Sequence, residues 1–260
     1  MATNNHTGMD DLRKVLDRKL SSQSFATNLD QASSLDQAKQ ITRFYNGIEG
    51  GISVLSDMKA RKSYAYYGVL AVKLGLQEKE VIINSIWEDE LLSLVHNDDL
   101  KKKYSLELRF FQFLNSLNKE DRPGYEAITK LRATNSGGEL FFLKHRIIYI
   151  NLEDGDMSLS LCQYNLIIEH PGFDAPDGII HNTRTGEVIG MADADAAEIL
   201  SSREREIIGL IKRGNRSKDI AFKLGVSIHT VNRHRQNIFA KLNVTNAMEA
   251  CRIAEALGVV

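Results

Sequence analysis

The stretch from Leu200 to Val244 decides the fold of the C-terminal part of the chain; it reads LSSREREIIGLIKRGNRSKDIAFKLGVSIHTVNRHRQNIFAKLNV. Ser201 and Glu204 have the spacing of a capping box, in which each side chain bonds the backbone N–H of the other residue where a helix starts. Two further serines are placed to cap the next two helices, and two glycines to end the first two. These residues are Ser217, Ser227, Gly214 and Gly225. The pattern predicts a helix-turn-helix arrangement with a glycine turn before its third helix.

The third predicted helix, residues 228–242, has an apolar and a polar side. Val231, Ile238 and Leu242, with His234 between them, are spaced to pack inward. The opposite side carries His229, Asn232, Arg233, Gln236 and Ala240. In a major groove, arginine can bond guanine, and asparagine or glutamine can bond adenine, each through two hydrogen bonds. A solvated helix face would explain the charge, but it would not explain this polar face together with two caps and a glycine turn.

This ordered stretch closely resembles the LuxR-type (GerE-like) helix-turn-helix of bacterial transcription regulators. The family pattern runs roughly L-T-x-R-E-x-E-V-L, then G-x-S-x-K-E-I-A-x-x-L, then S-x-x-T-V-x-x-H-x-x-x-I-x-x-K-L, and the chain follows it almost throughout. The resemblance covers about sixty residues and implies a four-helix domain whose third helix enters the major groove. At the position after Thr-Val the family commonly has Lys, whereas this chain has Asn232, so the base preference there stays open.

The resemblance also implies roles for individual residues. Asn232, Arg233 and Gln236 are expected to read bases. Phosphates are expected to be met by Arg216, Ser217, Lys218, Thr230, Arg235 and Lys241. The fourth helix, about residues 246–257, is expected to form the dimer contact. Its inner side would hold Ala247, Ala250, Ala254 and Leu257, and its partner-facing or solvent-facing side Met248, Cys251, Arg252 and Glu255. Small residues of this kind also occur in an ordinary packed helix.

Composition and charge agree with a separate C-terminal module. Residues 201–260 hold eleven Lys or Arg and five Asp or Glu, a net charge of +6, whereas residues 1–200 carry −7. A basic segment on an acidic body suggests nucleic-acid binding. No charge-free stretch approaches the length of a membrane-spanning helix, and the N-terminus does not resemble a secretory signal. The two cysteines are far apart, so we expect neither a disulfide framework nor a metal site, and we expect a reducing cytoplasm.

The N-terminal part is expected to be an α+β domain. Residues 1–43 predict one or two amphipathic helices, and residues 169–199 predict a linker with a small hairpin at 178–191. Between them, we expect strands at 52–55, 63–67, 125–133, 140–151 and 157–168, and helices at 69–76, 78–94 and 101–117. This order resembles a PAS domain over residues 44–168, and Val95–Leu100 is similar to the V-H-P-x-D segment of many PAS domains, with Asn97 in place of Pro. A phospho-receiver is excluded because its β-α alternation is missing.

Several readings of the N-terminal domain stay open at this level. No flavin-photosensor motif and no P-loop or catalytic triad pattern is present, so we predict no cofactor and no enzyme activity, while a small-molecule ligand of unknown identity is compatible with the fold. His145 and Cys162 are interpreted as core residues. The sequence therefore predicts a cytoplasmic, homodimeric regulator that binds double-stranded DNA, with RNA polymerase or a signalling protein as a further partner and no membrane. The alternative is a ligand-free interaction or dimerisation module at the N-terminus.

Overall fold

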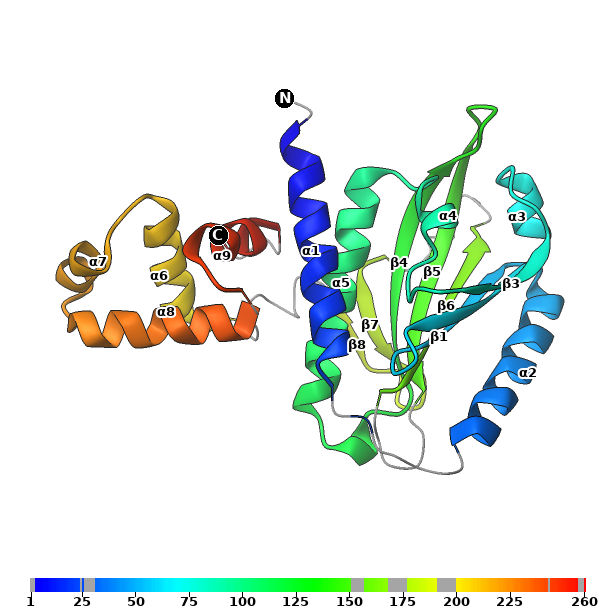
Figure 1. Ribbon diagram of the computed structural model, residues 1–260, viewed down its shortest axis with the longest axis horizontal. Coiled ribbons are helices and arrows are strands. Elements are labelled where there is room, and N and C mark those ends of the chain that lie inside the picture. The colour runs from blue at the N-terminus through cyan, green and yellow to red at the C-terminus, as the bar shows by residue number, and fades with distance from the viewer. Residues whose placement is uncertain are drawn as a thin grey trace. The chain divides into compact units, whose positions relative to one another are not determined.

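A computed structural model shows the arrangement of the elements (Figure 1). The chain forms two compact units: residues 21–191, and residues 192–260 together with the N-terminal residues 1–20. The described residues are 3–23, 25, 31–150, 157–167, 177–190, 200–242, 244–256 and 260. Between the expected strands at 140–151 and 157–168 the sequence also predicts a turn at Glu153–Asp156; this turn and most of the expected linker lie outside the described residues. Among the described residues, no helix combines the length and the hydropathy needed to cross a membrane.

The larger unit is built on one antiparallel sheet of eight strands, in the order β3-β2-β1-β6-β5-β4-β7-β8. The strands are β1 (Ile52–Asp57), β2 (Lys62–Tyr67), β3 (Lys79–Ile83), β4 (Tyr125–Thr134), β5 (Leu140–Ile150), β6 (Leu159–Leu166), β7 (Ile179–Asn182) and β8 (Val188–Gly190). Five of the expected strands and the small hairpin are confirmed. The hairpin, however, belongs to the sheet, because β7 pairs with β4 over four residues. The α+β class is therefore correct, and the residues assigned to a linker extend the sheet.

The register of the sheet places two different sets of side chains on its two faces. Val54 lies opposite Cys162, and Cys162 lies opposite Ile147, so these three side chains share one face. Leu55 lies opposite Leu161 on the other face. The register of the sheet therefore decides which residues meet the covering helices.

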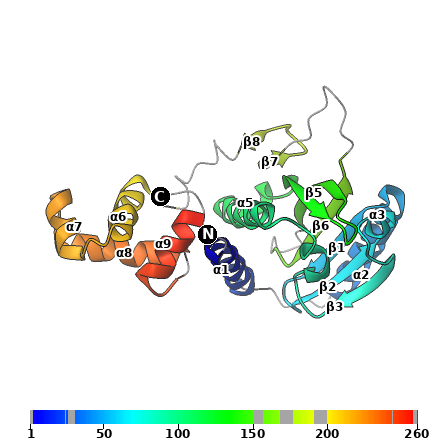
Figure 2. The ribbon, with the colours of Figure 1, turned by 90° about the horizontal axis from the view of Figure 1, so that it is seen from above.

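The two faces are covered by different helices, as Figure 2 shows. The long helices are α2 (Gln31–Glu49) and α5 (Asn97–Ser116), and the short ones are α3 (Val69–Lys73) and α4 (Asp89–Leu92). Ala38 of α2 packs against Leu55 and Leu159. On the opposite face, α5 packs against β4, with Tyr104, Leu108, Phe111 and Leu114 buried as its spacing predicted. The core thus lies in two layers, one on each side of the sheet.

Two expected boundaries are wrong. Residues 78–94, expected to form a helix, contain β3, a loop and the short α4. The segment Val81–Ile83 is apolar and β-branched, and it pairs with the backbone of β2, a long-range partner that the local pattern does not reveal. The expected break at residue 43 falls inside α2, which continues to Glu49, and Ile41, expected on the inner side of that helix, is exposed.

The glycines at the start of the sheet allow a close approach of two backbone segments. Gly68 donates its N–H to the carbonyl of Gly51 at 2.8 Å. A Cβ on Gly68 would lie 2.6 Å from that carbonyl oxygen and 2.9 Å from the carbonyl carbon of Gly50. Both are backbone atoms of the two residues that precede β1, so they cannot move aside as a flexible side chain would.

We therefore expect Gly68→Ala to lower the free energy of unfolding by about 1–3 kcal/mol, the usual cost of overpacking. The matched control is Gly47→Ala in α2, where no atom lies within 4 Å of the added methyl. That change should stabilise the chain by up to about 1 kcal/mol, because alanine favours a helix over glycine. Urea titrations followed by Trp87 fluorescence measure both. Equal stability of the two variants would contradict the close approach.

Candidate nucleic-acid interface

The helices after residue 200 pack as the sequence predicted. They are α6 (Ser202–Lys212), α7 (Ser217–Leu224), α8 (Ile228–Leu242) and α9 (Ala247–Ala256), drawn from yellow to red in Figure 1. Helix α8 contacts each of the other three. Its predicted inner residues Val231, Ile238 and Leu242 are buried. The third helix is thus held from one side and leaves its other side outward.

The predicted capping box is present at the start of α6. The Glu204 backbone N–H donates to Ser201 Oγ at 3.3 Å, and the Ser201 N–H donates to Glu204 Oε2 at 2.8 Å. The same Glu204 oxygen accepts a hydrogen bond from Lys241 Nζ at 2.7 Å. Burial alone would raise the pKa of the Glu204 carboxyl, but the bonds from Lys241 and Ser201 outweigh it and hold the pKa below its ordinary value. Glu204 therefore ties the start of α6 to the last turn of α8.

The turn between α7 and α8 is set by local backbone chemistry. Gly225 ends α7 in the left-handed region at φ +63°, a conformation that glycine adopts without strain. Ser227 caps α8, since its Oγ accepts from the Thr230 N–H at 3.0 Å. The cap expected at Ser217 is wrong: Ser217 is the first residue of α7. The carboxylate of Asp219 accepts instead from the Arg216 N–H at 3.2 Å.

The residues expected to read bases lie together on the outer side of α8. Asn232, Arg233 and Gln236 are all exposed, as are the neighbouring His229 and Ala240. Neighbouring members of this set are one to four residues apart, and together they span about three helical turns on the side opposite the buried stripe. The structure thus provides a continuous outward strip of polar side chains with an arginine within it. Their contact with bases stays a prediction.

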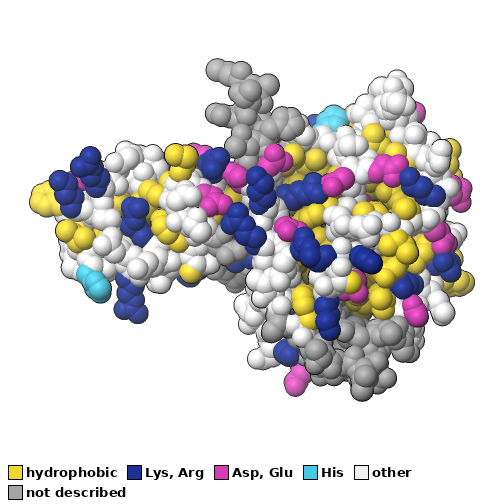
Figure 3. All heavy atoms as spheres, viewed as in Figure 1, with side chains coloured by type: hydrophobic (Ala, Val, Ile, Leu, Met, Phe, Trp, Pro, Cys, Tyr) yellow, Lys and Arg dark blue, Asp and Glu magenta, His cyan; other side chains and the backbone are white. Residues whose placement is uncertain are grey.

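The residues expected to meet phosphates differ in their accessibility. Arg216, Lys218 and Lys241 are exposed, whereas Ser217, Thr230 and Arg235 are half-buried. The Thr230 hydroxyl is hydrogen-bonded to Ser227 Oγ at 2.8 Å, and the Arg235 guanidinium lies 5.8 Å from the centre of the Phe239 ring. Figure 3 shows lysine and arginine side chains over the visible face of the C-terminal helices. Lys241 has a structural partner in Glu204, which the sequence pattern did not show.

The residues of α9 expected to form the dimer contact differ in their exposure. Met248 is 72% exposed, and Glu255 is exposed and paired with Lys212 at 3.0 Å, whereas Cys251 and Arg252 are half-buried. Two ion pairs join α9 to α1 (Thr3–Ser21) within the same unit: Arg252 with Asp11 at 3.3 Å and Arg18 with Glu249 at 3.4 Å.

The inner side of α9 agrees with the expectation in part. Ala250 and Ala254 are buried as expected and Ala247 is half-buried, and Ile253, which the pattern analysis missed, is buried as well. Leu257 lies outside the described residues. The small residues therefore pack this helix onto its own unit.

Residues 198–254 match the family model of bacterial regulatory proteins of the luxR family. This segment is a LuxR-family helix-turn-helix domain. The oxygen regulatory protein NreC of Staphylococcus epidermidis is 34% identical over 120 residues, which are 46% of this chain and 49% of NreC. The monoamine regulon transcriptional regulator of Klebsiella aerogenes is 46% identical over 55 residues, 21% of this chain and 24% of the relative. The chain thus spans about half the length of NreC, and these relatives are named as regulators.

Two solved structures extend over most of the chain but with low similarity. A phage VqmA in complex with DPO is 14% identical, covering 88% of this chain and 91% of its own, with a TM-score of 0.31. SdiA of Escherichia coli is 14% identical, covering 95% of this chain and 97% of its own, with a TM-score of 0.25. TM-scores of this size do not indicate a shared overall arrangement, so neither structure bears on the larger unit.

Sequence reasoning missed a group of polar residues in the core of the larger unit. Lys103 and Glu107 of α5 are fully buried beside His145 of β5 and Cys162 of β6. His145 and Cys162 are core residues, as interpreted. The signal for the other two was present, because Lys103 and Glu107 share the helical spacing of the buried Leu100, Tyr104 and Phe111.

We expect the link between α6 and α8 to depend on pH. The folded-state pKa of Glu204 lies below its unfolded value of about 4.3, so its contribution to stability is complete above that value and is lost as the pH falls through the folded pKa. The protection factors of amides in α6 and α8, measured by hydrogen exchange against the intrinsic rate at each pH, should therefore fall more on acidification in the natural chain than in Glu204→Gln.

The control for this pH effect is Glu206→Gln. The Glu206 carboxylate is exposed and pairs at the surface with Arg203 at 2.7 Å. This variant should keep the pH dependence of the natural chain. An unchanged acid response in Glu204→Gln would show that the Lys241 bond does not join the two helices.

Proposed function

We propose that this chain is a sequence-specific DNA-binding transcription regulator that acts as a dimer. The observation that carries the proposal is the outward polar strip of α8, on a segment that matches the LuxR family. Asn232, Arg233 and Gln236 supply base-reading groups, and Arg216 and Lys218 supply exposed charge beside them. Ser217, Thr230, Arg235 and Lys241 complete the proposed phosphate contacts. The net charge of +6 on residues 201–260 favours a polyanionic partner.

The proposal for the larger unit is a PAS-like sensory domain. Its support is the element order: two short strands, short helices, one long helix and three long antiparallel strands, with α5 on one face of the sheet. A signal that changes this domain would reposition two DNA-binding heads and alter their fit to paired half-sites. In this proposal Met248, Cys251, Arg252 and Glu255 of α9 contribute to the contact between the heads.

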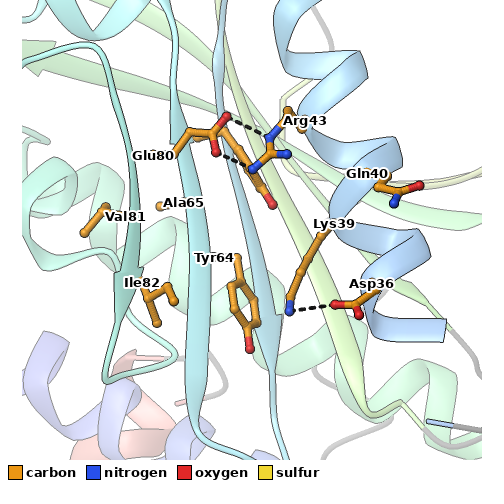
Figure 4. Close-up of a pocket in the computed structure, with 10 residues that line it drawn as sticks. Asp36, Lys39, Gln40, Arg43, Tyr64, Ala65, Glu80, Val81 and Ile82 are labelled. Carbon is orange, nitrogen blue, oxygen red and sulfur yellow. Dashed lines mark hydrogen bonds and ion pairs between the residues drawn. The ribbon is translucent and has the colours of Figure 1, made fainter. Parts of the chain in front are cut away.

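A second candidate role of the larger unit is dimerisation or protein interaction, and exposed apolar side chains favour it. Ile41, Phe44 and Ile48 of α2 are 60%, 73% and 68% exposed and lie along one side of the helix. Beside α2 runs a groove of about 470 Å³ (Figure 4). In it the guanidinium of Arg43 pairs with Glu80 of β3 at 2.8 Å, and Lys39 pairs with Asp36 at 3.1 Å. This surface suits a partner that covers apolar and charged groups together.

The test of base recognition needs a DNA target. Such targets are obtained by passing genomic fragments over the immobilised chain and sequencing the fragments that bind. Arg233→Ala and Gln236→Ala should each weaken binding to such a target by about 1–3 kcal/mol and leave binding to random DNA nearly unchanged. Lys218→Ala should weaken both and reduce the slope of log K against log salt by about 1.

The control for DNA reading is Lys212→Ala, which removes the same charge from the end of α6, where Lys212 pairs with Glu255. Its salt slope should stay close to that of the natural chain. If the three test variants bind the target as the natural chain does, the assignment of the α8 face is wrong.

Self-association through α2 is tested by Phe44→Ser. Removing an exposed aromatic ring from the contact should weaken the dimer by about tenfold or more, as at interface hot spots, measured by analytical ultracentrifugation. The matched variant Met248→Ser removes an equally exposed apolar side chain from α9. A loss of dimer in Met248→Ser alone would assign the contact to α9 and exclude the α2 surface.

A further inference from the structure

Three metal-binding side chains meet inside the larger unit. Glu107 comes from α5, His145 from β5 and Cys162 from β6, and all three are buried. One ligand atom from each lies within 4.8 Å of the other two. The sheet register accounts for this meeting, because His145 and Cys162 lie on adjacent strands, two pairs apart on the face that α5 covers.

The separation of two of the ligand atoms matches that in a tetrahedral zinc site. His145 Nε2 lies 3.5 Å from Glu107 Oε1. In a tetrahedral zinc site, with bonds of about 2.0 Å to nitrogen or oxygen and 2.3 Å to sulfur, ligand atoms stand about 3.3–3.7 Å apart. The nitrogen and oxygen are therefore already at the separation that such an ion imposes. Thiolate and imidazole are ligands of zinc rather than of magnesium or calcium.

Independent support comes from buried polar atoms that lack hydrogen-bond partners. Among the described residues, these include His145 Nε2 and the hydroxyl of Tyr149, in residues that are 1% and 6% exposed. Buried polar atoms normally have hydrogen-bond partners, so two unpaired ones on one strand need an explanation. His145 and Tyr149 lie on the same face of β5, and the Tyr149 ring packs against Phe110 and Phe111 of α5, so both residues lie between the sheet and α5.

The formal charges around the cluster are balanced when a divalent cation is present. Lys103 Nζ lies 2.8 Å from Glu107 Oε1 and 3.8 Å from Glu88 Oε1, so one ammonium serves two buried carboxylates. With a divalent ion and a thiolate at Cys162, the two carboxylates and the thiolate balance Lys103 and the ion to zero. The Lys103 ammonium does not prevent an ion from binding to Glu107, because the ammonium has Glu88 as a second partner. A metal ion binds a neutral imidazole through a ring-nitrogen lone pair, and His145 Nε2 has no hydrogen-bond partner that would occupy that lone pair.

We propose that Glu107, His145 and Cys162 form a zinc site that joins α5 to the sheet. The expectation of no metal came from the absence of a local cysteine motif, whereas these ligands come from three separate elements. Binding forms three bonds from protein atoms to Zn²⁺ and releases the thiol proton of Cys162, with any proton held by Glu107, to solvent. Three protein ligands leave a fourth position for water or a small anionic or thiol ligand. This zinc proposal does not depend on the proposals that the chain binds DNA or that the larger unit has a PAS-like fold.

The test is a cobalt titration of the full-length chain after chelator treatment, under reducing conditions. One Co²⁺ per chain should bind and give a thiolate-to-cobalt charge-transfer band with the intense visible bands of a tetrahedral site, and Zn²⁺ should remove both. Cys162→Ser should abolish the charge-transfer band. Glu107→Gln and His145→Gln should weaken binding by about tenfold or more, the loss that even changes outside the ligand set cause.

The matched controls are Cys251→Ser, which removes the other cysteine, and His181→Gln, which removes a histidine paired with Glu126 at 3.1 Å. Both should bind Co²⁺ as the natural chain does. Absence of stoichiometric binding, or a charge-transfer band that survives Cys162→Ser, would overturn the proposal. X-ray absorption on the zinc-loaded natural chain tests it without any substitution: one sulfur with nitrogen and oxygen neighbours is expected, and a first shell without sulfur refutes it.

Discussion

The pairing of β6 with both β1 and β5 is the interaction on which the larger unit depends. It joins the first strands of the domain to the last long ones, so segments more than a hundred residues apart become neighbours in one sheet. The same register fixes which side chains face α5. Because successive residues of a strand point to opposite faces, a slip of one residue would turn Cys162 away from α5 and bring Leu161 toward it. The core and the proposed metal site therefore rest on one choice of register.

The buried charges beneath α5 show how such a core accommodates polar groups. Removing a carboxylate or an ammonium from water costs several kcal/mol, and this cost is offset only by close pairing and hydrogen bonds. Lys103 meets that condition for Glu107, and Glu88 also accepts a hydrogen bond from the Tyr164 hydroxyl. The remaining unpaired atoms are what distinguishes this group from a closed structural ion pair. A chain that needed only a stable core would be better served by apolar residues of the same volume.

The C-terminal unit uses similar bonds for a different purpose. Glu204 caps α6 and holds Lys241 of α8, while Gly225 and Ser227 fix the angle at which α8 leaves the turn. These contacts and the buried stripe of α8 hold that helix from one side. The exposed polar strip follows from this arrangement, since a helix held on one side must present the other to solvent. A pocket for DNA is not needed, because a major groove accepts a protruding helix.

The sequence by itself determined the elements whose signals are local. The capping box at Ser201, the glycine turn at Gly225 and the inward stripe of α8 each depend on residues that are close together in the sequence, and so does the alternation at 125–133 that predicted β4. The tertiary structure alone decided what depends on distant partners. Residues 79–83 became a strand because β2 offered them backbone hydrogen bonds. Glu107, His145 and Cys162 met because strand register and helix packing brought three elements together, and no local spacing encodes such a meeting.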